Sequence, residues 1–404
     1  MTTGTISIGG AEARRRHGAG FWLVATAFLI GMAFSTVPTP LYPLYAQRDS
    51  FSTFVVTVVF AVYAVGVMTA LVLVGRISDA AGRKRVLVPA LALESVAAVL
   101  FIVRPDLPGL LLARFVTGLG VGMLSAAATA YLHELHGRHR PERGSARFEI
   151  VSTAANIGGL GVGPLIAGVL AESTSAPLVV PYAVFLVLLL VAIGAVALAP
   201  ETVERRVGED PRSPRPTVRS LGAGFWVAAG AAFASFSIFG VFTSVAPAFL
   251  ASALDERSSA LSGAIVFLVF GAAAVAQTAT SALPAHRRLM AGILGEIVGL
   301  CVVVLGMTTR GLPLFLLGGA LAGAAAGILF KGAVGTVVAE TGPAQRGAAL
   351  SALFLVAYLG LIVPVLGMGI AALAMPAGTA MLGLSAVLVL FLLWLLTTQF
   401  RPRR

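Results

Sequence analysis

Four charged side chains lie inside long apolar stretches of the sequence, where a charge is costly. Glu94 and Glu296 each follow a basic cluster by eight or nine residues, about 12–13 Å along a helix. A carboxyl group in such surroundings favours its neutral form, which suits a group that takes up and releases a proton. Arg114 and Lys331 need a polar cavity, a partner or a bound anion. These four residues are the first candidates for chemistry.

The two acids have an alternative role as structural hydrogen-bonding groups. An internal repeat, described below, pairs Glu94 with Val298, and a slip of two residues would turn Glu296 by ~200° on its helix. Arg114 also has an alternative, because its long side chain could reach the nearer membrane surface. We expect Arg114 to be functional, and we keep Glu94 and Glu296 as candidates for proton coupling.

Lys331 lies 20 residues from Gly311, too deep to reach the outer surface easily. It could bind a substrate, take part in coupling, or pair with a buried carboxylate such as Glu296. Glu149, near the start of another apolar stretch, is expected to pair with Arg143 or Arg147.

Polar residues in the same stretches could line a cavity. Ser35, Thr39 and Tyr42 lie in the first apolar stretch, where three prolines between 38 and 43 interrupt the helix. Asn156 and Gln277 would add amide groups from two other stretches. Each could instead serve helix packing, which is the commoner role of such residues in a membrane helix.

The elements that hold these residues are membrane helices. Hydrophobic residues make up 58% of the 404 residues and charged residues only 11%, against about 25% in soluble proteins. Continuous apolar runs of roughly 20 residues fit helices that cross a bilayer, whereas a β-barrel would show short alternating segments. We predict an all-α polytopic protein with twelve transmembrane helices near 20–44, 54–76, 86–104, 107–134, 147–172, 178–199, 222–250, 259–283, 289–309, 312–339, 347–373 and 377–400.

Basic residues separate the two sides of the membrane. Nearly all of them fall in the terminal segments and in every second loop, and only Arg48, Arg104, Arg257 and Arg310 fall on the opposite side. The positive-inside rule then places both termini in the cytoplasm. Arginine greatly exceeds lysine in a sequence rich in Ala, Gly and Val, which is typical of a GC-rich bacterial genome. We expect a multi-pass protein of a bacterial cytoplasmic (inner) membrane.

The sequence contains an internal duplication. GAGFW at 18–22 returns at 222–226, an offset of 204, and RGSA at 143–146 matches RGAA at 346–349. Between them, 200–221 is polar, rich in proline and of mixed charge, as a linker is. We predict two pseudo-symmetric six-helix bundles, 1–199 and 222–404, joined by a cytoplasmic linker at 200–221.

The loop between the second and third spans carries a Gly-x-x-x-Asp-x-x-Gly-Arg-Lys pattern, formed by Gly75, Asp79, Gly82, Arg83 and Lys84. The first glycine permits close helix packing and the second a tight turn, while the aspartate can hold an arginine or a facing helix. This pattern resembles the cytoplasmic-loop signature of the major facilitator superfamily, and the twelve spans and the 6+6 repeat extend the resemblance to nearly the whole chain.

The resemblance implies roles for further residues. The loop cluster would be a lock on the outward-facing state, with Glu134 as a partner of its arginines. Arg114 matches the arginine of a fourth-helix motif that the family uses in proton coupling. The fifth span resembles an antiporter motif through Gly159, Gly163, Pro164 and Gly168. Ala167 replaces a second glycine that is common there, and small residues at this spacing also serve packing alone.

Other classes of function lack their residues. The five histidines fall in tails or predicted cytoplasmic loops, so no catalytic or metal-binding cluster is expected at mid-membrane. The single Cys301 gives no ligand set. No phosphate-binding Gly-x-x-x-x-Gly-Lys loop is present for an ATP-driven pump. The net charge of +11 is spread over loops, which argues against nucleic acid. We expect no enzyme, no cofactor and no metal.

Together these features predict a secondary active transporter that works by alternating access. The leading hypothesis is proton-coupled efflux of small hydrophobic or amphipathic compounds, drugs or metabolites. The alternative is a proton-coupled uptake symporter for a sugar or organic anion, which Lys331 would suit. The expected partners are a small-molecule substrate, protons and the lipid bilayer, and the protein is expected to act as a monomer.

Overall fold

The computed structural model describes residues 8–74, 82–140, 142, 144–202, 222–244, 247, 250 and 258–399. Twelve of the helical segments found there are long and apolar enough to cross a membrane, which confirms the predicted all-α fold with twelve spans. Because the number of spans is even, both ends of the chain lie on one side of the membrane. We call this the terminus side and the other the far side.

The first half supplies six spans. Its first span combines α1, a 3₁₀ turn η1 and α2, and its fifth combines α7, a π-helical turn η2 and α8. The bounds are α1 Ile8–Thr36, η1 Thr39–Leu41, α2 Tyr42–Asp49, α3 Thr53–Val74, α5 Lys84–Val103, α6 Leu107–His139, α7 Ala146–Thr153, η2 Ala154–Gly158, α8 Gly159–Ser173 and α9 Val180–Leu198.

The second half supplies the other six spans, each a continuous helix in the part of the chain that is described. The bounds are α10 Ala223–Ser244, α12 Ser259–Ala279, α13 Ala285–Thr308, α14 Leu312–Glu340, α15 Pro343–Ala371 and α16 Ala377–Gln399.

Most predicted spans agree with the helices to within a few residues, but the first was placed too narrowly. α1 begins before Arg14–Arg16, and the span continues through η1 and α2 to Asp49. Hydropathy marks only the part of a helix that is apolar, so a helix that continues into water is underestimated at its charged end. The prolines interrupt the helix as predicted, since α1 ends at Thr36 and Pro40 lies in η1.

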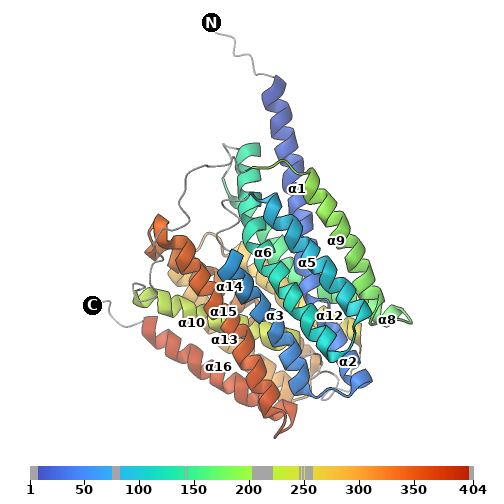
Figure 1. The fold of residues 1–404 in the computed structure, drawn as a ribbon. Helices are drawn as coiled ribbons and strands as arrows, with labels where there is room; N and C mark the ends of the chain where they lie inside the picture. Colours follow the sequence, from blue (N-terminus) through green and yellow to red (C-terminus); the bar gives the residue numbers. More distant parts are fainter. Residues whose placement is uncertain are drawn as a thin grey trace.

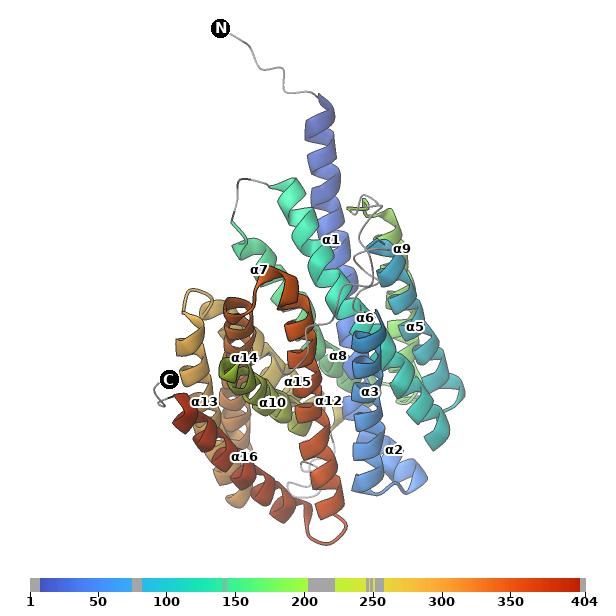
Figure 2. The same ribbon diagram turned by 60° about the vertical axis from the view of Figure 1, so that its left-hand side comes forward.

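The two halves stand side by side, with most of the first half on the right of Figure 1, most of the second on the left, and α12 of the second half among the helices on the right. α8 packs along α12, and α3 packs along α15, so these two pairs form the contact between the halves. Figure 2 shows α3 next to α15 and α8 next to α12 from a second direction. A substrate path between the halves would therefore be bounded by these four helices.

Backbones of the two halves come very close toward the far side. A β-carbon added at Gly263 of α12 would lie 2.1 Å from the carbonyl oxygen of Pro164, and one at Gly168 of α8 would lie 2.2 Å from that of Ser259. Glu172, at the end of α8, accepts hydrogen bonds from Ser258 Oγ at 2.7 Å and from the backbone N–H of Ala260 at 2.9 Å. These contacts hold the halves together on the far side.

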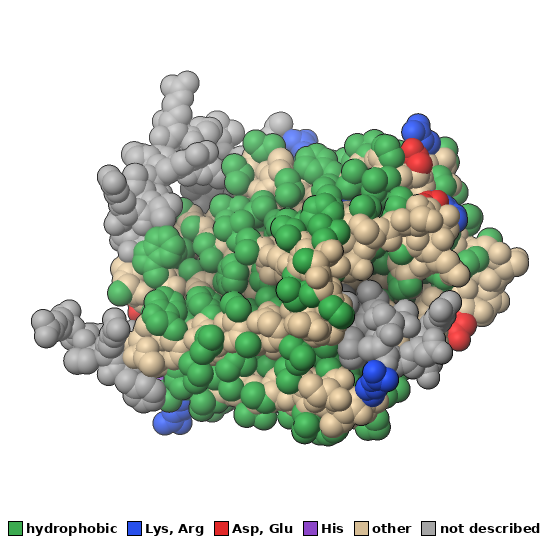
Figure 3. All heavy atoms as spheres, turned by 90° about the horizontal axis from the view of Figure 1, so that it is seen from below, with side chains coloured by type: hydrophobic (Ala, Val, Ile, Leu, Met, Phe, Trp, Pro, Cys, Tyr) green, Lys and Arg blue, Asp and Glu red, His purple; other side chains and the backbone are tan. Residues whose placement is uncertain are grey.

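The lipid-facing surface is apolar. Large hydrophobic side chains are exposed on most spans, among them Trp22, Trp226 and Trp394, each about half exposed. Figure 3 looks at the far-side end of the molecule, where hydrophobic side chains also dominate and the few charged ones are scattered, mostly near the rim of the view. The exposed hydrophobic side chains on the spans lie on the surface that surrounds the bundle. Such a surface is stable only against hydrocarbon, as expected of a membrane protein.

Candidate functional site

The terminus-side loop between α3 and α5 ends at Gly82 and Arg83, directly before α5. Gly82 has φ +100°, a left-handed conformation that favours glycine, as the motif requires. Directly after it, Arg83 donates from Nη2 to Glu134 Oε1 on α6 at 2.7 Å and from Nε to the same oxygen at 3.1 Å. The Arg83 side chain is 10% and that of Glu134 29% exposed, so the arginine is largely shielded from water and the glutamate is partly accessible. Gly75 and Asp79 lie outside the described residues.

The start of the linker completes this cluster, which sequence reasoning missed. Glu201 accepts hydrogen bonds from the backbone N–H groups of Arg83 at 3.3 Å and Lys84 at 3.2 Å, so it caps the first turn of α5. Thr202 donates from Oγ1 to the second oxygen of Glu134. The Pro-Glu-Thr sequence at 200–202, directly after an apolar span, was a clue to this role.

Lys84 continues the cluster to α9, where Nζ donates to the carbonyl oxygen of Ala197 at 2.8 Å. These contacts therefore join four parts of the first half: the loop before α5, the helices α6 and α9, and the start of the linker. We call Gly82, Arg83, Lys84, Glu134, Glu201 and Thr202 the loop cluster.

Arg114 is buried within the first half and does not reach the membrane surface. It is 2% exposed, and its Nη1 donates to the carbonyl oxygen of Ser35 on α1 at 2.8 Å. Its guanidinium lies over the ring of Tyr63, 4.4 Å from the centroid, and 5.9 Å from that of Phe60. The snorkelling alternative is therefore wrong. A cation on α6 is held between α1 and α3, and its Nε has no hydrogen-bond partner among the described residues.

Glu94 and Glu296 are both fully buried, and neither carboxyl group has a hydrogen-bond partner among the described residues. Val298, the repeat partner of Glu94 by sequence offset, is 54% exposed, so the two acids share an inward direction despite the offset. The alternative of a satisfied structural hydrogen bond is not seen for either acid within the described part of the chain.

The packing around the Glu94 side chain distinguishes it from Glu296. A β-carbon at Gly31 of α1 would lie 2.9 Å from its Oε2, and one at Gly120 of α6 would lie 2.7 Å from its Cγ. Two glycines thus make room for this carboxyl group between α1 and α6, the same two helices that Arg114 joins. Glu296 lies on α13, which packs on α14 and α16, away from the contact between the halves.

The glycine-proline segment of α8 faces two helices at once. Gly159 and Gly163 pack against backbone atoms of α1: added β-carbons would lie 2.9 Å from Leu29 O and 1.9 Å from Ala33 O. The other face, through Pro164 and Gly168, packs against α12 of the second half. Small residues on both faces allow backbone contact within one half and across the interface.

The polar residues predicted to line a cavity differ in whether their side chains already have hydrogen-bond partners. Ser35 Oγ donates to Met32 O at 2.7 Å, so its hydroxyl serves its own helix. Thr39 is 3% exposed and Asn156 partly exposed in the π-helical turn. Tyr42 Oη and Gln277 Nε2 are buried without a hydrogen-bond partner among the described residues. These two groups have unused capacity to bind a solute or water.

Lys331 joins the halves. Its Nζ lies 3.6 Å from Glu149 Oε2 on α7 and donates to the backbone carbonyl of Gln277 on α12 at 3.2 Å. The predicted pairing of Glu149 with Arg147 is not found; Arg147 instead lies over the Trp22 ring, and Arg143 is outside the described residues. The alternative of a Lys331–Glu296 pair is also wrong, because neither carboxyl oxygen of Glu296 has a hydrogen-bond partner among the described residues.

Within the described residues, no group of three or more His, Cys, Asp or Glu side chains could hold a metal ion. The structure places polar and charged groups inside a helical bundle. Two pairs of helices, α8 with α12 and α3 with α15, join the halves of this bundle. Such groups can bind a solute, exchange a proton and respond to helix movement.

Comparison with known proteins agrees with this architecture. Similar structures include the nucleoside transporter NupG (TM-score 0.72, 12% identity, 95% of this chain and 100% of that chain) and the human organic anion transporter MFSD10 (TM-score 0.67, 17% identity, 94% and 99%). A bacterial homologue of the human lysosomal transporter Spinster, inward-facing and unoccupied, is also similar (TM-score 0.68, 14% identity, 95% and 94%). A search of curated sequences found no match.

At these identities the structural likeness establishes the fold alone. The sequence itself matches the profile of the Major Facilitator Superfamily over residues 23–309, most of the chain. The chain therefore belongs to the Major Facilitator Superfamily, whose members are membrane transporters rather than enzymes.

Proposed function

We propose that this transporter exports small hydrophobic or amphipathic compounds in exchange for protons. It would act as a monomer in a bacterial inner membrane, with both termini in the cytoplasm. Each half would rock against the other around a central binding site, as alternating access requires. The tight far-side contacts then correspond to an inward-facing state, in which the site is reached from the cytoplasm.

The observation that carries the direction of transport is the two-sided packing of α8. Its Gly159 and Gly163 touch α1, while Pro164 and Gly168 touch α12 of the second half. This places the antiporter-type segment at the contact that must change when the halves move. A glycine-lined contact lets two backbones slide without side-chain interlocking, and Pro164 leaves one backbone carbonyl without an intrahelical donor.

Proton coupling would rest on Glu94 and Arg114. Arg114 connects α6 to α1, and Glu94 of α5 is the buried acid that glycines of these same two helices accommodate. Protonation of Glu94 would change the charge where α5 packs against α1 and α6, the helices that the fixed charge of Arg114 joins. Glu296 stays a second candidate for coupling.

The loop cluster would be the gating lock. Arg83, Lys84 and Glu134, with Gly82 at the turn, hold the terminus-side ends of α5, α6 and α9 as one body. Gly75 and Asp79 would complete it by packing against the second half in the outward-facing state. Glu201 and Thr202 would pass movement of the linker to this lock.

A second candidate function is proton-coupled uptake of an organic anion or a sugar. The contact between Lys331 and Glu149 supports it, because an anionic substrate could replace the carboxylate beside the lysine. Gln277, whose backbone carbonyl already binds Lys331, has a buried side-chain nitrogen with no hydrogen-bond partner in the described part of the chain. Ser35, Thr39, Tyr42 and Asn156 are the remaining cavity candidates.

Growth of a bacterial strain that overproduces the protein, tested against a panel of toxic compounds, separates export from uptake. Export predicts resistance to a subset of amphipathic compounds, lost in Arg114→Ala and retained in Arg310→Ala, an exposed arginine on the far side. Hypersensitivity instead of resistance would indicate uptake. Western blotting of membranes would show that each variant is inserted at the same level.

A further inference from the structure

A basic pocket lies at the terminus-side end of the first half. It has a volume of about 290 Å³, near the lower end of ordinary ligand pockets of ~300–1,000 Å³. Arg15, Phe21 and Trp22 of α1, His136, His139 and Arg140 of the α6 end, and Arg147 of α7 line it. None of its described lining residues is acidic, so the pocket would attract an anion.

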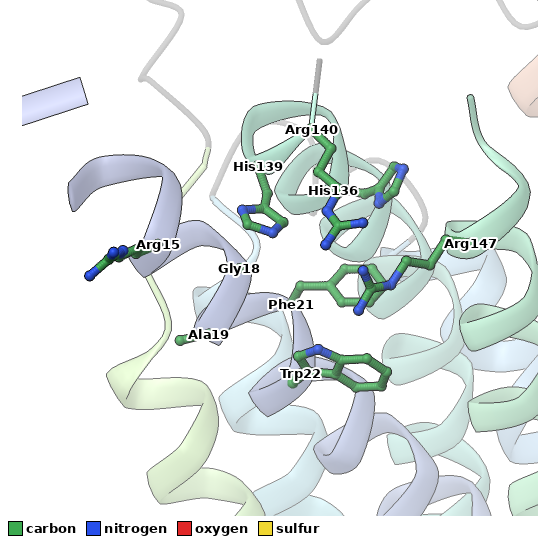
Figure 4. A pocket seen from close by; sticks show the side chains of 9 residues that line it. All are labelled: Arg15, Gly18, Ala19, Phe21, Trp22, His136, His139, Arg140 and Arg147. Carbon is green, nitrogen blue, oxygen red and sulfur yellow. The ribbon is translucent and has the colours of Figure 1, made fainter. Parts of the chain in front are cut away.

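His136, His139, Arg140 and Arg147 gather near the aromatic rings of Phe21 and Trp22, whereas the Arg15 side chain points away from them (Figure 4). The Arg147 guanidinium lies 5.3 Å from the centre of the Trp22 ring, and Phe21 and Trp22 pack edge to face at 5.5 Å. Arg140 and His139 lie above these rings in the same view. His139 is fixed by a 2.8 Å contact from Nδ1 to Arg14 O and by its packing on Gly18. The pocket is therefore built from ordered side chains of three helices.

The second half serves as an internal control. Phe225 and Trp226 repeat the aromatic pair with nearly the same geometry, 5.4 Å and 81° against 5.5 Å and 80°. Trp226 and Trp22 are also similarly exposed, at 54% and 50%. Both halves therefore carry the aromatic pair. Tryptophan is common at the membrane interface, so the pair needs no further explanation.

The basic lining has no counterpart in the second half. At the 204 offset of the aromatic pair, His136, His139 and Arg140 correspond to Glu340, Pro343 and Ala344. At the 203 offset of the RGSA and RGAA segments, Arg147 corresponds to Leu350. α14 ends at Glu340, whereas α6 continues for another turn that carries the pocket's basic groups. The fold does not require these charges, so they are an addition to the first half.

We propose that this pocket binds the phosphate group of an anionic lipid. The half-exposed Trp22 places the pocket at the edge of the lipid-facing surface, where headgroups lie. Arginine suits a phosphate because its planar group donates two hydrogen bonds at once. A bound headgroup would link α1, α6 and α7, and so would stabilise the terminus-side end of the first half.

The test compares lipid retention by the purified full-length protein, using native mass spectrometry with phosphatidylglycerol or phosphatidylcholine of the same acyl chains. We expect at least about fivefold more phosphatidylglycerol than phosphatidylcholine adduct on the wild type, corresponding to about 1 kcal/mol. Arg140→Gln/Arg147→Gln should lose this preference. Arg346→Gln, which removes an exposed terminus-side arginine from the second half, should retain it.

Two further measurements keep the result decisive. Arg140→Lys/Arg147→Lys should recover part of the preference, which shows that the loss in the glutamine variant is not misfolding. Inorganic phosphate at millimolar concentration should neither raise the unfolding temperature nor displace phosphatidylglycerol. Equal retention of both lipids by the wild type, full retention by the glutamine variant, or displacement of phosphatidylglycerol by phosphate would overturn the proposal.

Discussion

Lys331 Nζ lies 3.6 Å from Glu149 Oε2, so a lysine of the second half faces a carboxylate of the first half on the terminus side. Glu149 is also held by Ser145, whose Oγ donates to Oε1 at 2.8 Å. The pair is partly exposed, with 20% of the lysine and 42% of the glutamate side chain accessible. An ion pair this exposed contributes only about 0–1 kcal/mol to stability, so its charges are available for another partner.

We expect Lys331→Gln to reduce transport of carboxylate-bearing compounds by about tenfold or more, since a charge-assisted contact is worth about 1.5–3 kcal/mol. Transport of neutral amphipathic compounds should change less than about twofold. Initial rates for matched acid and amide forms of one compound would check this. Glu149→Gln is the control, because it frees the lysine without removing it. Unchanged transport of the acid would exclude Lys331 from substrate recognition.

Glu94→Gln should uncouple transport from the proton gradient. The amide keeps the shape of the side chain between Gly31 and Gly120 but cannot exchange a proton. We expect gradient-driven transport to fall at least about tenfold, while substrate exchange without a gradient continues. Both assays run on the same proteoliposomes.

Glu296→Gln is the matched control, because this acid is equally buried but lies on α13. It should keep gradient-driven transport. If Glu94→Gln keeps it and Glu296→Gln loses it, the assignment of the coupling acid is reversed.

The ion pair between Arg83 and Glu134 should contribute about 1–3 kcal/mol to the free energy of unfolding, because the arginine is largely shielded. A double-mutant cycle with Arg83→Ala and Glu134→Ala, measured by SDS-induced unfolding, gives the coupling energy. Arg85→Ala removes an exposed arginine two residues away and should change stability by less than about 0.5 kcal/mol. A coupling energy near zero would show that the pair is incidental.

Gly263→Ala should weaken the contact between α12 and α8, because its methyl group would meet Pro164 O. Overpacking of this kind costs about 1–3 kcal/mol, and here it acts only when the far side is closed. We expect a shift toward a state open on the far side, seen as faster thiol labelling of a single cysteine placed at Ser259 in a Cys301→Ser background.

The control is Gly367→Ala on α15, whose added methyl group would meet open space. It should label at the rate of the parent protein. Slower labelling of Gly263→Ala than of the parent would contradict the assignment of this contact to the closed far side.

The fold was largely predictable, because a membrane helix can be recognised from a long apolar run in the sequence. Twelve spans and the duplication follow from hydropathy and repeated motifs alone. The ends of the helices could not be predicted from hydropathy, as α1 shows, because the part of a helix that leaves the bilayer is no longer apolar.

Contacts between side chains were harder to predict. The sequence identified Arg114, Glu94 and Lys331 as unusual, since a charge in an apolar run is rare. It did not identify their partners, because which residue faces Lys331 depends on how the two halves are docked. Glu149 and the linker residues Glu201 and Thr202 are close to their partners only in three dimensions.

The central claim, proton-coupled export, is tested most directly in inside-out membrane vesicles with an imposed proton gradient, acid inside. A compound identified by the resistance screen should accumulate in vesicles that carry the wild-type protein, and a protonophore should abolish the accumulation. Vesicles with Glu94→Gln should show gradient-driven uptake lowered by at least about tenfold. Accumulation that is undiminished by the protonophore would contradict the account.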